Sequence, residues 1–227
     1  MMTMGPRLDS ICSLLCPGEV LADIGTDHGY LMVNILIKGL FQRALGVELN
    51  CGPMESARQT VREAGLHDRV DLRLGDGLTP LVPGEADALV VAGMGGHTIC
   101  TILRNGVDRL AGVRQMVLQP QSAHPKLRRC LRGLGWKIAD ERLVTEDGRL
   151  YLVLSAVPGD SQPLSWEDEQ IGPVLRRSRP PLYAAYVEQM ITERKRIVRS
   201  MSKAVHPDHG RIRLLCDEMD RLKEQLE

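Results

Sequence analysis

The chain has 227 residues and equal numbers of basic and acidic side chains, 29 Lys and Arg against 29 Asp and Glu. This balance excludes a globally basic surface, so any patch for nucleic acid must be local. Its 43% apolar content is enough for one packed domain and a smaller appendage. No run approaches the roughly 18 to 20 apolar residues of a membrane span, and no charged N-terminal segment leads into one. We therefore expect a cytoplasmic protein.

The first 135 or so residues alternate short apolar runs with helical patterns. A short helix is expected over Pro6–Leu15. The expected strands are Val20–Ile24, Arg43–Val47, Val70–Leu74, Ala88–Ala92 and Gln115–Leu118. The expected helices between them are Tyr30–Lys38, Cys51–Ala64, His97–Asn105 and Pro125–Leu134. This alternation predicts an α/β fold with right-handed crossovers and a mostly parallel sheet.

Two extended runs close this region without a helix between them. Trp136–Leu143 and Leu150–Val157 flank Asp147-Gly148, a dipeptide typical of β-hairpin turns. An antiparallel pair at the edge of a parallel sheet departs from the six parallel strands of a nicotinamide-binding domain. It matches the seven-stranded sheet of methyltransferases that use S-adenosylmethionine.

The remaining residues have a different character, which predicts two domains, 1–158 and 159–227. Four prolines lie in residues 159–181, and two heptad patterns follow, separated by His206-Pro-Asp-His-Gly210. The heptad positions are Val187, Ile191, Arg194, Val198, Met201 and Val205, then Ile212, Leu215, Met219, Leu222 and Leu226. This pattern predicts an antiparallel coiled-coil hairpin.

No metal site is expected. The six cysteines lack the C-x2-C spacing of zinc sites, and we expect them to be reduced and mostly buried. His206 and His209 are three residues apart, but they flank a proline and lack further ligands, so we interpret them as loop residues.

The stretch LADIGTDHGYL, residues 21–31, follows the first strand directly. Glycines at such a strand end let the backbone approach a ligand, and the next helix presents free N–H groups. Asp27 stands where a dinucleotide fingerprint has its second glycine, so it would repel phosphates and suit a cation such as the sulfonium of S-adenosylmethionine. The alternative for Asp27 is a helix cap.

Three further strand ends carry related signals. Glu48 follows the second strand about 20 residues after the glycine turn, where it could bind a ribose diol. Gly75-Asp76-Gly77 follows the third strand, where the carboxylate could accept from an adenine amino group. Ala92-Gly-Met-Gly-Gly96 follows the fourth, where backbone could pack against a flat ligand. Each also has an ordinary explanation: Glu48 could be a solvated charge at a strand end, Asp76 a turn residue, and the glycines of residues 92–96 parts of tight turns.

The fifth strand ends at Gln119, whose amide suits the Watson–Crick edge of a base but could equally bond its own loop. Five basic residues and no acid follow within residues 124–137, which indicates either a solvated helix face or a phosphate-binding track. They are Lys126, Arg128, Arg129, Arg132 and Lys137. Between Arg176 and Arg213 ten basic residues stand against three acids, a local balance of 10 − 3 = +7.

Taken together, DIGTDHGYL, GVELNCGPMESAR, GDGL, VVAGMGG and LQPQ closely resemble the TrmK family of bacterial tRNA (adenine-N1)-methyltransferases. The resemblance is strong over Cys12–Val157 and only architectural in the tail. It implies a class I methyltransferase Rossmann-like fold with a C-terminal helical coiled-coil domain. It also implies methyl transfer from S-adenosylmethionine to N1 of adenine 22 in tRNA. Two positions depart from the family: Gln121, where Asn is common, and Gly29, where Ala is common.

The resemblance assigns the cofactor to one group of residues at the strand ends. They are Asp23, Gly25, Asp27, His28, Gly29, Glu48, Gly75, Asp76, Gly77, Gly93 and Gly95. We expect the adjacent residues Thr26, Leu49, Ala92 and Met94 to belong to the same cofactor site. For catalysis we expect Asp27 to stabilise the cationic methylated base, His28 to orient base or cofactor, and Gln119 to accept from N6. A structural role for His28 at the helix start remains open.

The basic tail predicts a tRNA-binding arm rather than a dimerisation device, on a monomer or weak dimer. Charge reversal at Arg194, Lys195 and Arg196 is expected to weaken tRNA binding and its salt dependence. The alternatives are a methyltransferase for another RNA, for DNA or for a small molecule, and a non-catalytic RNA-binding module.

Overall fold

The computed structural model describes residues 5–160 and 162–227; residues 1–4 and 161, which the predicted domains include, lie outside that part. The chain divides into two compact units, Met1–Pro163 and Leu164–Glu227. The predicted boundary after residue 158 coincides with the end of the last strand, slightly before this division.

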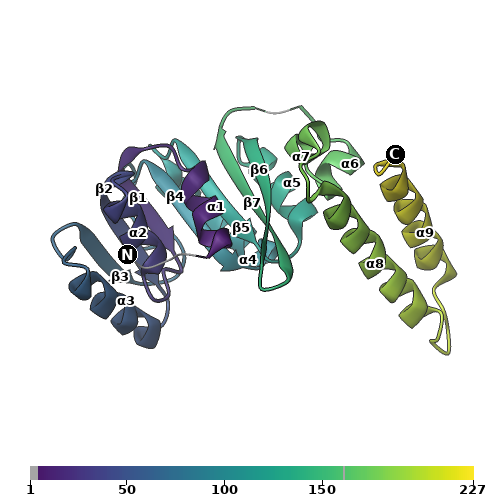
Figure 1. Ribbon diagram of the computed structural model, residues 1–227, viewed down its shortest axis with the longest axis horizontal. Helices are drawn as coiled ribbons and strands as arrows, with labels where there is room; N and C mark the ends of the chain where they lie inside the picture. Colours follow the sequence, from purple (N-terminus) through teal and green to yellow (C-terminus); the bar gives the residue numbers. More distant parts are fainter. Residues whose placement is uncertain (1–4, 161) are drawn as a thin grey trace. The chain divides into compact units, whose positions relative to one another are not determined.

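Unit 1 is built on a seven-stranded sheet in the order β3-β2-β1-β4-β5-β7-β6 (Figure 1). β1 to β5 pair in parallel, and β7 runs antiparallel to both β5 and β6. The strands are β1 (Gly18–Ile24), β2 (Phe41–Glu48), β3 (Val70–Leu74), β4 (Ala88–Met94), β5 (Gln115–Pro120), β6 (Trp136–Glu146) and β7 (Arg149–Pro158).

Helices cover both faces of this sheet. They are α1 (Pro6–Leu14), α2 (Tyr30–Ile37), α3 (Cys51–Glu63), α4 (Gly96–Asn105) and α5 (His124–Gly133), with a 3-10 turn η1 (Val107–Leu110) after α4. The predicted α/β fold is confirmed, and every predicted strand and helix of this region is present with ends shifted by at most three residues.

The core explains why these apolar runs fold as they do. Side chains of α1, α2 and α3 pack with Leu21, Val90, Val117 and Val153 in one cluster on one face of the sheet. α4 and α5 pack against one another and against β4 and β6 respectively. Because β1, β4 and β5 are covered on both sides, they are continuous apolar runs rather than alternating ones.

The β6–β7 hairpin turns where the sequence predicts it. Asp147 and Gly148 have φ of 49° and 71°, the left-handed conformations that a two-residue type I′ turn requires.

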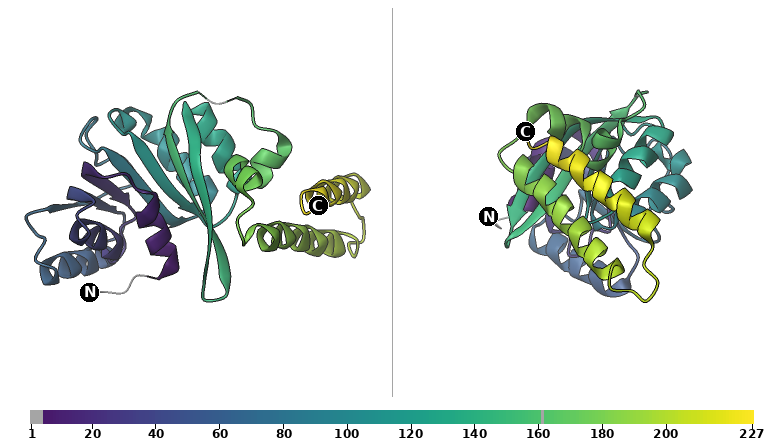
Figure 2. Two further views of the ribbon diagram at one scale, coloured as in Figure 1. Left: turned by 45° about the horizontal axis from the view of Figure 1, so that its top comes forward. Right: turned by 90° about the vertical axis from the view of Figure 1, so that its right-hand side faces the viewer.

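Unit 2 consists of α6 (Trp166–Gln170), α7 (Pro173–Ser178), α8 (Tyr183–Met201) and α9 (His209–Glu224). α8 and α9 lie side by side as an antiparallel hairpin (Figure 2). The predicted heptad residues that are buried lie away from the loop that connects the two helices: Val187, Ile191, Leu215, Met219 and Leu222. α8 ends at Met201, so Val205 is 90% exposed and does not belong to the seam.

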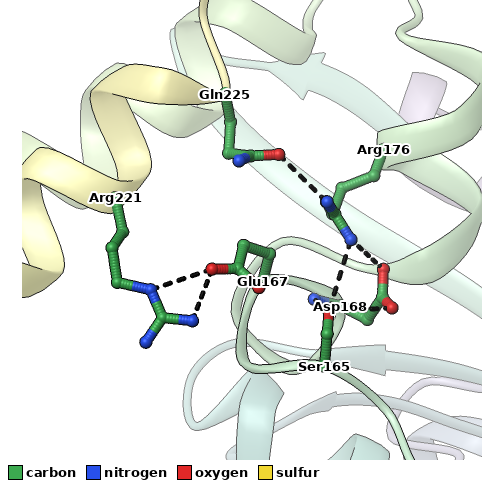
Figure 3. Close-up of polar contacts among 6 residues, drawn as sticks. All are labelled: Ser165, Glu167, Asp168, Arg176, Arg221 and Gln225. Carbon is green, nitrogen blue, oxygen red and sulfur yellow. Dashed lines mark hydrogen bonds and ion pairs between the residues drawn. The ribbon is translucent and has the colours of Figure 1, made fainter.

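Polar contacts tie the short helices of unit 2 to the end of α9 (Figure 3). Arg221 donates to Glu167, and Arg176 donates to Asp168 and to Gln225. The Arg221 guanidinium also lies 4.2 Å from the centre of the Trp166 ring. Unit 2 therefore relies on charged contacts as well as on a narrow apolar seam.

One predicted surface residue of the tail is structural. Arg194 donates to Glu218 at 2.8 Å and to Gln170 at 2.7 Å, and its side chain is only 14% exposed. Its heptad position faces α9, where an unpaired charge would be costly, so the expectation that Arg194 offers its charge to tRNA is wrong.

Candidate active site

A cavity of about 510 Å³ lies at the carboxyl ends of β1, β2, β3 and β4 in unit 1. Ligands in open α/β sheets bind at this edge. All predicted cofactor residues except Gly29 and Gly95 line this cavity. The fold therefore brings four separate sequence motifs to one place.

The first glycine turn owes its shape to left-handed backbone at Gly25, Asp27 and Gly29, with φ of 73°, 51° and 75°. Gly29 is the N-cap of α2, and no side chain caps that helix, which argues against the cap explanation for Asp27. The Asp27 side chain is 70% exposed, and its backbone N–H donates to Glu48 at 3.2 Å. A left-handed backbone is strained for a residue other than glycine, so the fold spends free energy to hold the Asp27 carboxylate in this position.

His28 is half exposed and stacks on Tyr30, with ring centres 5.6 Å apart. Its Nε2 lies 3.7 Å from Asp27 Oδ1. The two predicted catalytic residues of this turn are thus neighbours at the cavity rim.

Glu48 is buried, which excludes the solvated strand-end explanation. Its Oε1 accepts from the N–H groups of Leu49 and Asn50, and its Oε2 accepts from Asp27. A carboxylate offers about four acceptor positions, so one remains for a hydroxyl group of a ligand.

Asp23 lies beneath the turn, 3% exposed, and its Oδ2 accepts from Thr26 Oγ1 at 2.9 Å. Burial raises the pKa of Asp23 to about 6; the Thr26 hydrogen bond opposes this rise, and the charge of Glu48 adds to it. The two neighbouring carboxylates repel one another and add negative charge to the cavity floor. A bound cation would relieve it.

The third strand end contributes Asp76, which is exposed, between Gly75 and Gly77. A Cβ at Gly75 would collide with Pro80, and Gly77 has a φ of 55°, so both positions favour glycine. Leu49 is 60% exposed on the cavity wall, an apolar surface suited to a flat ring.

β4 ends in a bulge next to β5. The ladder pairs Ala92 with Gln119 and Met94 with Pro120, which leaves Gly93 outside it. Gln119 is fully buried, and its Oε1 accepts from the Gly93 N–H at 3.0 Å and from Arg7 Nη1 at 3.3 Å. Its oxygen is therefore already occupied, and Gln119 does not line the cavity, so the prediction that it accepts directly from a base does not match this geometry.

Sequence reasoning missed several lining residues, most of which come from outside the strand-end motifs; Tyr30, in contrast, belongs to the stretch 21–31 itself. Arg7 and Leu8 come from α1, Tyr30 from α2, and Thr98 and Ile102 from α4. For the last two, a signal was present, since they follow AGMGG directly on the helix that it begins. Nothing in the sequence near Arg7 points to the cavity.

The basic run after β5 is divided by the fold. Arg129, Arg132 and Lys137 are exposed, whereas Arg128 is completely buried and donates to the equally buried Glu141 at 2.9 Å. Arg128 shares its helix face with Leu127 and Leu131, so it stabilises the α5–β6 packing and is unavailable to a phosphate.

Within residues 5–160 and 162–227, no group of three or more His, Cys, Asp or Glu side chains is placed to hold a metal ion. Across the same residues, no helix has both the length and the apolar character needed to cross a membrane.

The seven-stranded sheet with antiparallel β7, together with an acidic and glycine-rich cavity at the strand ends, defines the class I methyltransferases that use S-adenosylmethionine. The model of the TrmK family, tRNA (adenine(22)-N(1))-methyltransferase, matches residues 21–224. The chain belongs to this family.

Individual relatives match along the whole chain. The tRNA (adenine(22)-N(1))-methyltransferase of Bacillus subtilis (strain 168) is 32% identical over 231 residues, covering 99% of this chain and 97% of that protein. The crystal structure of the B. subtilis enzyme superposes with a TM-score of 0.90 at 31% identity, over 100% of both chains. A Streptococcus pneumoniae relative in complex with S-adenosyl-L-methionine superposes with a TM-score of 0.87 at 29% identity, over 97% of this chain and 98% of that one.

Proposed function

We infer that this chain transfers the methyl group of S-adenosylmethionine to N1 of adenine 22 in tRNA. The observation that carries this function is the convergence of Asp23, Asp27, Glu48 and Asp76 on one cavity of a methyltransferase sheet. Four carboxylates around a space of about 510 Å³ suit a ligand that is cationic and carries no phosphate.

The residues present fit this cofactor. Glu48 has an acceptor position for a ribose hydroxyl, and Asp76 an exposed carboxylate for an amino group. Gly25, Gly75 and Gly93 contribute backbone to the cavity wall; a Cβ at Gly25 would meet the Met94 side chain and one at Gly75 would meet Pro80, so both of these positions favour glycine. When bound, S-adenosylmethionine supplies a methyl group on a cationic sulfur, which an in-plane nitrogen lone pair can take up in one displacement.

Adenine N1 is such a nitrogen, and it is buried in a base pair unless the nucleotide is turned out of its stack. The protein's contribution is then alignment and charge. We propose that the exposed Asp27 carboxylate at the cavity rim stabilises the positive charge that develops on the methylated ring. His28, held beside Asp27 and against Tyr30, orients the base.

For unit 2 we propose a tRNA-binding arm. Its loop end, called here the hairpin tip and comprising residues 195–213, holds six exposed basic residues and a single acid, Asp208. They are Lys195, Arg196, Arg199, Lys203, Arg211 and Arg213. Asp208 is occupied as the N-cap of α9, where it accepts from the Arg211 N–H. Most of these basic side chains form no ion pair within the part of the chain that the structure describes, so they are available to bind the phosphate backbone of tRNA.

We propose that the protein acts as a monomer or weak dimer, because α8 and α9 pack against one another within one chain. Its proposed tRNA substrate supports a location in the cytoplasm. Transfer of labelled methyl groups to unmodified tRNA tests the function. We expect incorporation into tRNA with adenine 22 and none when that base is changed to guanine. Equal incorporation into both would redirect the proposal to another base, and cofactor binding without transfer to any RNA would favour a non-catalytic RNA-binding module.

A further inference from the structure

Arg7 connects the N-terminal helix to the cavity. It lies in the first turn of α1, more than a hundred residues from its partners along the chain. Its backbone N–H and its Nε both donate to Glu146, each at 3.2 Å, and its guanidinium lies 5.7 Å from the centre of the Tyr151 ring. Glu146 and Tyr151 belong to the β6–β7 hairpin, which therefore holds both the main chain of Arg7 and the Nε side of its guanidinium group.

Gly5 shows how tightly this attachment is built. A Cβ at this position would collide with the carboxylate of Glu146. A side chain at position 5 would therefore displace the end of the Glu146 side chain, whose carboxylate accepts from both the main chain and the side chain of Arg7.

The far end of Arg7 reaches Gln119. Nη1 lies 3.3 Å from Gln119 Oε1, which also accepts from the Gly93 N–H at 3.0 Å. Because both neighbours are donors, only the oxygen of the amide can face them. Arg7 thus fixes the orientation of a side chain that is fully buried.

Gly93 depends on this amide. It is the bulged residue of β4, outside the β4–β5 ladder, and its N–H is satisfied by the Gln119 side chain instead of by a strand partner. Gly93 has a φ of 75° and lines the cavity, as Arg7 itself does. A chain of contacts therefore runs from Glu146 through Arg7 and Gln119 to the cavity wall.

We propose that Arg7 is a positioning residue for methyl transfer: by holding the Gln119 amide, it keeps the Gly93 bulge in the shape that aligns the reacting groups. This role rests on the proposed function and extends it to a helix that carries none of the strand-end motifs. The main consequence is kinetic, because a saturating cofactor concentration compensates for weaker binding but not for poorer alignment.

The test compares Arg7→Ala, Arg7→Lys and the control Asp9→Asn in the full chain. Asp9 lies on the same helix and pairs with Lys38 at the surface, away from the cavity. With saturating S-adenosylmethionine, we expect kcat on tRNA to fall about tenfold or more in both Arg7 variants, the scale of one charge-assisted hydrogen bond, and to stay unchanged in the control. Lysine keeps the charge but lacks the fork that bridges Glu146 and Gln119, so Arg7→Lys covers the case in which Arg7→Ala does not fold.

A double-mutant cycle with Gln119→Met decides whether Arg7 acts through Gln119. We expect the double variant to have the kcat of Gln119→Met alone, with the dissociation constant for S-adenosylmethionine, measured by calorimetry, changing less than the kcat. Losses in kcat that multiply would overturn the role, as would an unchanged kcat in the single Arg7 variants. A wild-type chain that transfers no methyl group to tRNA would instead overturn the proposed function.

Discussion

The rim of the cavity in unit 1 and the hairpin tip of unit 2 differ in charge and in how their charged groups are held. Beneath the rim, the carboxylates of Asp23 and Glu48 are buried and hydrogen-bonded at the ends of paired strands, while Asp27 at the rim itself is exposed. At the tip, the basic side chains are exposed on the last turns of α8, on the connecting loop and on the first turns of α9.

Each arrangement matches the task of its surface. A methyl transfer needs groups placed within fractions of an ångström, which a sheet edge with buried supports provides. Contact with a phosphate backbone needs positive charge within reach, and mobile exposed side chains supply it. We therefore expect substitutions at the rim to change the rate of methyl transfer, and substitutions at the tip to change tRNA affinity and its dependence on salt.

The largest expected effect concerns Arg128, a basic residue of unit 1 that behaves unlike those of the tip. Arg128→Met removes the positive charge opposite the buried Glu141, which is expected to destabilise unit 1 by about 3 to 5 kcal/mol. Denaturant unfolding, followed by the fluorescence of Trp136 in a Trp166→Phe background, measures this decrease in stability.

The matched control is Arg132→Met, an exposed position on the same helix, which should change the stability by less than about 0.5 kcal/mol. Adding Glu141→Leu to Arg128→Met should recover much of the stability. Equal effects at positions 128 and 132 would show that the buried pair has no special importance.

The second prediction addresses Asp27. Asp27→Asn removes the charge but keeps a residue that tolerates the left-handed backbone at φ 51°. We expect kcat to fall about 100-fold, the scale of one group that stabilises developing charge, while tRNA affinity changes little. Single-turnover methylation and a tRNA-binding titration measure the two quantities.

Asp147→Asn is the control for this substitution, since Asp147 also has a left-handed backbone, at φ 49°, and lies in the exposed β6–β7 turn. It should leave kcat unchanged. A similar kcat in Asp27→Asn and wild type would remove the Asp27 carboxylate from the mechanism.

These residues also show which parts of the molecule were predictable from sequence. The four strand ends were, because glycines and acids directly after apolar runs mark the edge where parallel strands meet. The partner of Arg128 was not, since Glu141 lies on the next strand and only the fold brings the two together. Arg7 was not for the same reason, and neither were the contacts of Gln119, whose oxygen accepts from Gly93 and Arg7 only because the fold brings these residues together.

Arg194 is an intermediate case. It occupies a heptad position between Ile191 and Val198, and a charge in a helix seam needs a partner on the facing helix. The pattern thus contained the information that Arg194 is structural, although it could not identify Glu218.

The third prediction tests the hairpin tip without Arg194. Reversal of Lys195, Arg199 and Lys203 to Glu is expected to weaken tRNA binding by at least tenfold at moderate salt. It should also reduce the slope of log K against log salt by about 0.7 to 0.9 for each phosphate that the variant no longer neutralises. Filter binding at several salt concentrations measures both.

Reversal of Arg58 and Arg62 on α3 and of Lys38 at the C-cap of α2, all in unit 1, provides a matched change in net charge. If that variant loses tRNA affinity as strongly as the tip variant does, overall charge rather than the arm governs binding. kcat at saturating tRNA should be nearly unchanged in the tip variant, in contrast to Asp27→Asn.

The smallest expected effect is the pH dependence of cofactor binding through Asp23. Its pKa of about 6 lies above the ordinary value of 3.8 because burial disfavours the charged form. A bound cation favours the carboxylate and lowers that pKa, so the affinity for S-adenosylmethionine should fall as the pH drops through 6, by about three- to fivefold at pH 5.5.

The free energy of unfolding of the free protein depends on pH in the opposite direction. Because the pKa of Asp23 is raised in the folded state, the contribution of Asp23 to stability increases as the pH falls from 7 towards 4. Calorimetric titrations and thermal unfolding at several pH values measure both, and Asp23→Asn should remove both dependences. If Asp23→Asn keeps the wild-type pH profile of cofactor affinity, the carboxylate beneath the rim does not sense the cation, and the buried half of the acidic rim serves the fold alone.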